Sequence, residues 1–155
     1  MGNRAIIIFT DGEEFSPTTY MHWNGGDVAP LLTELLTLMA DRGADLSYCS
    51  ARFVGIIHSH MEGNLSLGMF NTSTDGLLTA TGRLPYGKWL AELSHGDAGA
   101  FLVDFRTMQC HCYGGYGLVI GTERLANQAV PLSMLSMLSS AKTWAGRPVA
   151  TPSQA

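Results

Sequence analysis

Two histidines, at positions 58 and 60, have side chains that could bind a metal ion. Histidines that share one metal on a helix stand four residues apart, so that both rings point the same way. A spacing of two residues on a helix corresponds to roughly 200°, which directs His58 and His60 to opposite faces. Because the surrounding residues have helical periodicity, we expect a histidine at the helix end and a partly buried one.

A second group of metal-binding residue types is the run Cys110-His111-Cys112. On a strand the two thiols share one face and the imidazole points to the other, so the three cannot bind one ion locally. A zinc site would need both thiols and two distant ligands, such as His58 or Cys49. We therefore expect no metal and no cofactor. The alternative is a metal-dependent enzyme with ligands from His58, His60, Cys110, His111 and Cys112.

Motifs for nucleophilic catalysis are absent from the sequence. Such catalysis needs a base beside a thiol or hydroxyl, and Cys49 falls on the apolar face of an expected helix, where a small buried residue is typical. The glycines around Tyr116 come without the lysine and hydroxyl of a phosphate loop, which favours a turn. We expect no catalytic residues and no enzymatic activity.

The most unusual string in the sequence runs from Tyr20 to Gly26 and reads YMHWNGG. Aromatic side chains at the end of a strand, beside a glycine turn, are typical of protein-binding sites. Alternatively, Trp23 packs beneath the following helix and Asn24 caps the turn. Further aromatic residues lie near other glycine-rich turns. The residues that we expect to bind a partner are Tyr20, His22, Trp23, Asn24, Tyr86, Lys88, Trp89, Tyr113 and Tyr116.

The composition of the chain limits the classes of function. The 155 residues are 46% hydrophobic and 14% charged, which excludes intrinsic disorder. A net charge of −4 and a pI near 5.6 argue against direct binding of nucleic acid. No apolar segment approaches the roughly 20 residues that cross a bilayer, and we expect no membrane association. Three cysteines at no disulfide-framework spacing indicate reduced thiols and a cytoplasmic location.

Charge is unevenly distributed along the chain. Residues 1–50 hold seven acidic and two basic residues, whereas residues 51–155 hold six acidic and seven basic residues. A solvated acidic face and an acidic patch that contacts a partner are both compatible with this bias.

Short strands and a few helices must position these side chains. Period-two and β-branched patterns predict strands at 4–10, 18–23, 65–70, 100–106 and 108–113. Apolar residues at helical spacing predict helices at 27–42, 45–62, 88–93 and, with an interruption at Pro131, 123–144.

The order of these elements predicts an α+β fold. We expect a small, mostly antiparallel sheet with two consecutive helices packed on one face and a C-terminal helix. Residues 1–144 are expected to form a single domain and residues 145–155 a flexible C-terminal tail.

Several of these segments together resemble a group of small proteins encoded by phages and prophages. The group typically reads "NRA-x-I…YLHWNGG…ARF-x-QIIGNFF-x-G-x-LSLG…DNGVYVVD". The matching segments here are NRA at 3–5, YMHWNGG at 20–26, LSLG at 65–68 and GDAG at 96–99. The resemblance covers residues 3–105, and the C-terminal third has no counterpart. The chain also differs at 58–63, where it reads HSHMEG.

The resemblance implies a setting rather than a reaction. Together with the small size, the mild acidity and the lack of a catalytic motif, it implies a phage or mobile-element accessory protein that binds a host protein. An inhibitor of a host defence system such as CRISPR is the function that we expect. Another alternative is a homo-oligomeric structural or regulatory protein that buries its C-terminal helix, including Met134 and Met137.

Overall fold

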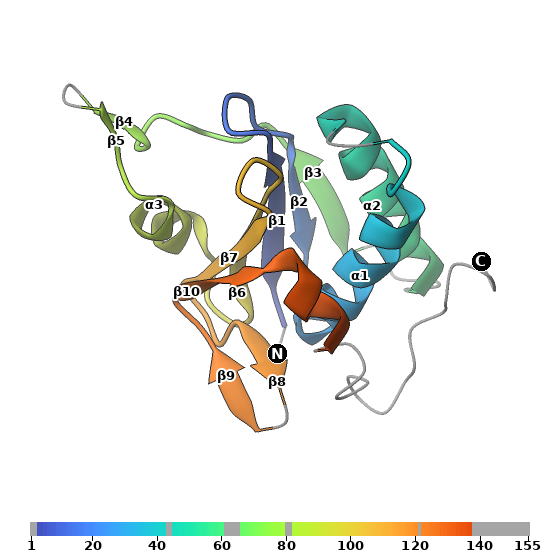
Figure 1. Cartoon of the computed structure of the whole chain (residues 1–155). Helices are drawn as coiled ribbons and strands as arrows, with labels where there is room; N and C mark the ends of the chain where they lie inside the picture. Colours follow the sequence, from blue (N-terminus) through green and yellow to red (C-terminus); the bar gives the residue numbers. More distant parts are fainter. Residues whose placement is uncertain (1–2, 43–44, 61–65, 80–81, 121, 138–155) are drawn as a thin grey trace.

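The computed structural model describes residues 3–42, 45–60, 66–79, 82–120 and 122–137, and its largest element is a six-stranded sheet (Figure 1). The strand order across the sheet is β10-β7-β6-β1-β2-β3. Its strands are β1 (Ala5–Thr10), β2 (Thr18–Met21), β3 (Leu67–Phe70), β6 (Gly99–Asp104), β7 (Gln109–Tyr113) and β10 (Gln128–Pro131). Two short hairpins lie outside it: β4 (Leu78–Thr79) with β5 (Gly82–Arg83), and β8 (Leu118–Ile120) with β9 (Glu123–Leu125).

The centre of the sheet is the parallel pair of β1 and β6, in which Ala5 is opposite Gly99 and Thr10 is opposite Asp104. Every residue of both strands is buried. A strand that is covered on both faces has a continuous apolar run instead of an alternating pattern, and this explains the isoleucines of β1. The other neighbouring strands pair antiparallel, so the expected mostly antiparallel sheet is confirmed.

Two consecutive helices cover one face of the sheet, as the sequence predicted. They are α1 (Val28–Leu38), which follows a 3₁₀ turn at Gly25–Asp27, and α2 (Leu46–His60). Their buried leucines, isoleucines and Phe53 pack against Ile7 and Phe9 of β1. The rings of Phe9 and Phe53 meet edge to face, with centroids 5.6 Å apart. This helix layer encloses the larger of two core clusters.

The opposite face of the sheet is covered by α3 (Tyr86–Leu93). Trp89 and Leu90 of this helix pack on Ile6 and Ile8, which alternate along β1 with the residues beneath α1 and α2. The indole Nε1 of Trp89 also donates a hydrogen bond to the carbonyl oxygen of Ser73, at 3.0 Å. The segment around Ser73 is therefore anchored to the core through α3.

The helix expected at 123–144 is wrong over residues 123–131. Residues 123–125 form β9, and β10 pairs antiparallel with β7, with Val130 opposite Cys110. Asn127 takes a left-handed φ of 57°, which breaks any helix between these strands. Helical structure begins only with the 3₁₀ turn at Leu132–Met134 and continues to residue 137.

The spacing of leucines that suggested a longer helix is preserved in this short segment. Leu132 and Leu135 are buried in the larger core, Met134 packs against it, and Met137 is exposed. The remaining expected helical residues, 138–144, and the expected tail at 145–155 lie outside the described residues. Within the part of the chain that the structure describes, no helix combines the length and apolar character needed to cross a membrane.

Candidate functional site

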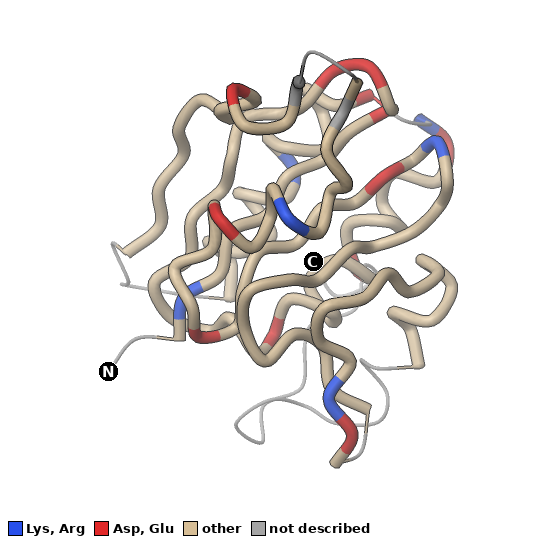
Figure 2. Tube along the Cα trace, turned by 90° about the vertical axis from the view of Figure 1, so that its left-hand side faces the viewer, with Lys and Arg blue, Asp and Glu red and all other residues tan. Residues whose placement is uncertain are grey.

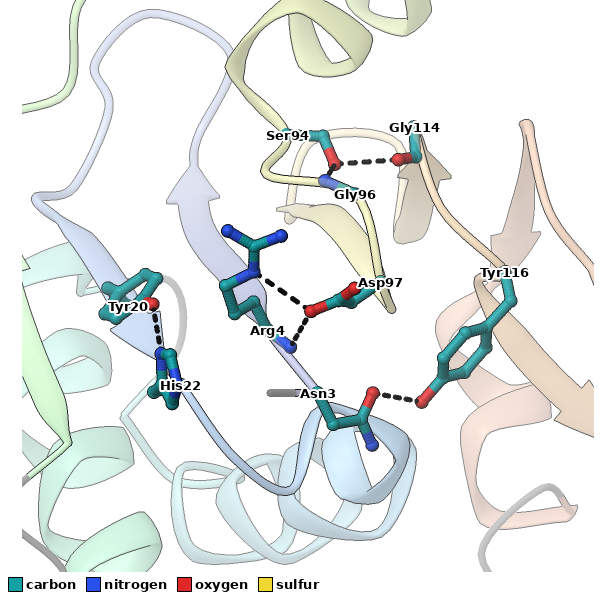
Figure 3. Close-up of polar contacts among 9 residues, drawn as sticks. All are labelled: Asn3, Arg4, Tyr20, His22, Ser94, Gly96, Asp97, Gly114 and Tyr116. Atoms are coloured by element: carbon teal, nitrogen blue, oxygen red, sulfur yellow. Dashed lines mark hydrogen bonds and ion pairs between the residues drawn. The ribbon is translucent and has the colours of Figure 1, made fainter. Parts of the chain in front are cut away.

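Four aromatic side chains gather where β2 ends, and we call Tyr20, His22, Trp23 and His95 the Trp23 cluster. A hydrogen bond of 2.7 Å joins the Tyr20 hydroxyl to Nδ1 of His22 (Figure 3). The His22 and Trp23 rings meet edge to face at 4.7 Å, and the Tyr20 and His95 rings at 5.4 Å. Trp23 is 37% exposed. The cluster therefore presents a large aromatic side chain to solvent on a hydrogen-bonded support.

An ion pair between Arg4 and Asp97 fixes the backbone beside this cluster (Figure 3). The backbone N–H and the Nε–H of Arg4 donate to the same carboxylate oxygen, Oδ2 of Asp97, at 3.0 Å and 2.9 Å. These donors lower the pKa of Asp97, the backbone N–H most strongly. Asp97 has a left-handed φ of 54°, so the turn before β6 adopts an uncommon backbone conformation in order to place its carboxylate there.

A third segment is attached to the same place through Tyr116. Its hydroxyl donates to Oδ1 of Asn3 at 2.8 Å, and its backbone N–H donates to the carbonyl oxygen of Asp97 at 2.9 Å. Burial raises the pKa of Tyr116, which keeps its hydroxyl protonated as a donor. The start of β1, the turn before β6 and the segment before β8 are thereby joined by side-chain hydrogen bonds.

The turn after Trp23 is pressed against these segments at Gly25. The Gly25 N–H donates to the carbonyl oxygen of Asn3 at 2.8 Å. A Cβ at this position would lie 2.5 Å from that oxygen and 2.7 Å from the Cβ of Ala98, so only glycine fits. Asn24 adopts a φ of 65° and its side chain makes no capping hydrogen bond.

The alternative interpretation of this turn is wrong for Asn24, which contributes a left-handed backbone conformation in place of a cap. Trp23 is partly covered and 37% exposed.

The remaining predicted residues form a separate group around α3 and β7. The ring of Tyr86 contacts Trp89 and His111, with centroids 6.3 Å and 5.2 Å apart, and Tyr113 lies against Gly87. Trp89 is 2% exposed, so its prediction as a partner-binding residue is wrong: the indole fills the core. Tyr86 and Tyr113 are half-buried, whereas Lys88 on α3 is exposed.

The structure separates the candidate metal ligands. Cys110 and Cys112 are buried in the core beneath α1 and α2, and His111 lies on the opposite face against Tyr86, as expected for a strand. His58 is exposed at the end of α2, and His60 contacts Glu34 at 3.0 Å. Among the described residues, no three His, Cys, Asp or Glu side chains lie close enough to hold a metal ion.

Burial changes the acid–base properties of two residues on β7. It lowers the pKa of His111, an effect that the nearby Asp104 partly opposes. A hydrogen bond with Cys112 and burial together raise the pKa of Cys110 well above its usual range. Both groups therefore favour their neutral forms.

A cavity of about 760 Å³, which we call the Ser50 cavity, lies between the loop that joins β1 to β2, the first turns of α2 and the segment that follows β3. No residue of the predicted binding set lines it. Its lining residues are Glu13, Glu14, Phe15, Ser16, Pro17, Leu46, Ser47, Ser50, Ala51, Met69, Thr72, Thr74 and Leu77.

The sequence did not predict several residues that shape the Trp23 cluster and the Ser50 cavity. Arg4, Asp97 and Asn3 belong to the NRA and GDAG segments of the phage-like pattern, and that pattern was their signal. The acidic excess in residues 1–50 was the corresponding signal for the Ser50 cavity, because Glu13 and Glu14 lie at its margin. His95 has no local signal at all.

Comparison of the chain with models of protein families, with curated proteins and with solved structures finds no significant match in any of the three.

Proposed function

We propose that this protein is a non-enzymatic accessory protein of a phage or mobile element that binds a host protein through the Trp23 cluster. The observation that carries the proposal is the exposed indole of Trp23 in edge-to-face contact with His22, which is itself hydrogen-bonded to Tyr20. Tryptophan and tyrosine are enriched among residues that dominate binding free energy, since they bury a large area at a small cost in side-chain entropy.

The support beneath the cluster favours binding further. Arg4, Asp97, Asn3 and Tyr116 hold the neighbouring backbone through hydrogen bonds of 2.8–3.0 Å. A surface whose backbone is already ordered loses little conformational entropy when a partner binds. The segments that carry the phage-like pattern, at 3–5, 20–26 and 96–99, meet at this place, which supports a shared role for them.

The partner class that we propose is a component of a bacterial defence system, such as a CRISPR effector, in the host cytoplasm. The phage-like pattern and the small size of the chain support this choice. The net charge of −4 supports a protein partner over direct contact with nucleic acid.

The binding proposal is tested by affinity capture from a bacterial host lysate with the wild-type protein and a Trp23→Ala variant. We expect a host protein that the wild type retains and that the variant retains about tenfold less, a typical loss for a central aromatic contact. Phe70→Ala is the matched control, because Phe70 is also an exposed aromatic residue but stands at the far end of β3. Capture of no host protein above background, or equal capture by Trp23→Ala, would contradict the proposal.

The partner class is tested separately by plating a phage on cells with an active CRISPR system. Expression of the wild-type protein should restore plaque formation, and Trp23→Ala should not. If the wild-type protein captures a host protein from the lysate but does not restore plaque formation, the partner is not a component of that CRISPR system. The proposal that the protein binds a host protein would then still stand.

A further inference from the structure

The two edges of the six-stranded sheet are the strands β3 and β10, which lie on opposite sides of the sheet (Figure 1). In an antiparallel pair, successive residues direct their backbone N–H and C=O groups alternately toward the neighbouring strand and away from it. One hydrogen bond in the known register therefore fixes the direction of every backbone group along an edge. Whether a further strand can be added depends on the groups that point away from the sheet.

On β3, the backbone groups of Leu67 and Met69 point away from the sheet. The N–H of His22 donates to the carbonyl oxygen of Ser66 at 3.1 Å, and these two residues are opposite each other when the β2–β3 register is continued by one residue. Two residues further along, Gly68 directs its backbone groups toward β2 in the same way, so Leu67 and Met69 have the opposite orientation. Within the described residues, these outward groups form no hydrogen bond.

On β10, the outward position is blocked by a proline. The N–H of Leu132 donates to the carbonyl oxygen of Met108 at 3.0 Å, which continues the β10–β7 register by one residue. By the same alternation, Ala129 and Pro131 carry the backbone groups that point away from β7. Pro131 has no N–H to donate, and proline at an edge is a common protection against further pairing. The sheet can therefore be extended at β3 but not at β10.

The open edge at β3 lies in an uncharged part of the chain. Charged residues are separated along the trace by long uncharged stretches (Figure 2), and residues 66–74 form one of these stretches. Natural edges are commonly protected by a lysine, a proline or a bulge, whereas β3 has none of these and carries Met69, which is 46% exposed. The whole chain has a net charge of −4, so two copies repel each other least where neither is charged. This favours a second copy of the chain over a charged partner.

The spacing of the outward groups makes the edge complementary to itself. Leu67 and Met69 stand on either side of Gly68, so a two-fold axis at Gly68 places Leu67 of one copy opposite Met69 of the other. Two such pairs form, and each exchanges two hydrogen bonds. Both side chains lie on the face covered by α1 and α2, where Leu67 packs against the larger core and Met69 lines the Ser50 cavity. The methionine of each copy would then cover the leucine of the other.

We propose that two copies of this chain pair antiparallel through β3 and form one continuous sheet with a two-fold axis at Gly68. The contact between two four-residue strands is smaller than the ~1,200–2,000 Å² of standard interfaces, so the dimer is weak, with a dissociation constant of about 10–100 μM. Assembly stops at the dimer, because both remaining edges carry Pro131. The proposal does not depend on the function proposed for the Trp23 cluster, and its surface differs from the C-terminal helix considered above for a homo-oligomer.

The proposal is tested by sedimentation equilibrium of the full chain at concentrations from about 1 to 500 μM, which span the expected dissociation constant. Met69→Pro removes an outward N–H and leaves the hydrogen bonds between β2 and β3 in place, so it should weaken the dimer at least about tenfold. Met69→Leu keeps the N–H and an apolar side chain, and as the matched control it should dimerise like the wild type. Circular dichroism verifies that each variant is folded.

Three results of this experiment would overturn the proposal: a monomer at every concentration, assembly beyond the dimer, or equal weakening by the two variants. A monomer whose Met69→Pro variant fails to capture the host protein that the wild type retains would assign the edge to that host protein. This result would also overturn pairing between two copies.

A disulfide across the two-fold axis locates the contact without a change at Met69. Opposed residues of a non-hydrogen-bonded antiparallel pair have Cα atoms about 4.5 Å apart, within the range of about 4.4–6.8 Å that a disulfide spans. A Cβ at Gly68 would lie 3.9 Å from the Tyr20 ring, an ordinary contact, so Gly68→Cys fits the fold. After mild oxidation this variant should run as a covalent dimer in non-reducing electrophoresis, because the three native cysteines are buried.

The matched control for the disulfide is Gln128→Cys on the blocked edge. Gln128 is exposed on β10 and directs its backbone toward the neighbouring strand, as Gly68 does on β3. This variant should remain a monomer under the same oxidation. No covalent dimer from Gly68→Cys, or an equal amount from Gln128→Cys, would overturn the proposal.

Discussion

Side chains alternate between the two faces of the sheet along β7, and this alternation sets the environment of each residue. Cys110 and Cys112 lie in the core beneath α1 and α2, and His111 lies across the sheet against Tyr86. Nε2 of His111 is buried and has no hydrogen-bond partner among the described residues. A charged imidazolium would need two acceptors at this position, so His111 is retained as a neutral ring.

His111 should make the stability of the protein sensitive to pH. Burial lowers its pKa in the folded state below the ordinary 6.5, so the unfolded chain binds the proton more tightly. The contribution of His111 to the free energy of unfolding is therefore complete above pH 6.5 and declines as the pH falls through that value. Urea unfolding of wild type and His111→Gln at a series of pH values measures this contribution. The decline should be smaller in the variant, and identical pH dependence in both proteins would contradict it.

At the scale of elements, local sequence patterns predicted the central elements. The continuous apolar run of β1, the leucine spacing of α1 and the apolar face of α2 are each a pattern typical of one kind of element, and all three elements lie where they were expected. The helix predicted over residues 123–131 was wrong because a segment of this length can form either a helix or strands. The strand β10 forms within this segment because it pairs with the outer edge of β7. Such pairing between distant segments leaves no periodic signal in the sequence.

The candidate sites were predictable only in part, for the same reason. The string around Trp23 drew attention because its residue types are rare together, and its aromatic residues do form one cluster. The contact of Arg4 with Asp97, and the meeting of Glu14 with Ser50 at one cavity, join residues that are far apart in the chain. Trp89 could not be distinguished from an exposed aromatic residue, since its burial depends on how α3 lies on the sheet.

Two glycines should respond in opposite directions to the same substitution. Gly25→Ala should lower the free energy of unfolding by about 1–3 kcal/mol, because the new methyl group meets Asn3 and Ala98 at distances of 2.5 Å and 2.7 Å. Gly55→Ala in α2 should raise it by about 0.5–1 kcal/mol, because no atom lies within 4 Å and alanine favours a helix. Chemical denaturation measures both. Equal effects of the two substitutions would show that the turn after Trp23 is not closely packed.

At the scale of the whole molecule, the sheet separates two core clusters that share its strands. The larger lies beneath α1 and α2, and the smaller lies beneath α3. All three cysteines are free and buried, and all three belong to the larger cluster. Solvent access to these thiols therefore requires that the larger core cluster opens.

Thiol labelling should consequently report the opening of the larger core cluster. Burial raises the pKa of Cys49 to about 11, and that of Cys110 is also raised, so few reactive thiolates exist in the folded state. We expect a disulfide reagent at pH 8 to label the native protein slowly and the urea-unfolded protein rapidly at all three cysteines. Rapid labelling of Cys110 or Cys112 in the native protein would contradict the burial of β7 between its neighbours.

The parallel pairing of β1 with β6 has a consequence for how the chain is made. β1 is synthesised well before its central neighbour β6, which begins only at Gly99. Until then, β1 has only the antiparallel hairpin with β2, and one of its edges is unpaired. Pairing between such distant segments slows folding and exposes an apolar strand in the meantime. The isoleucine-rich edge of β1 is therefore open to aggregation until β6 is available.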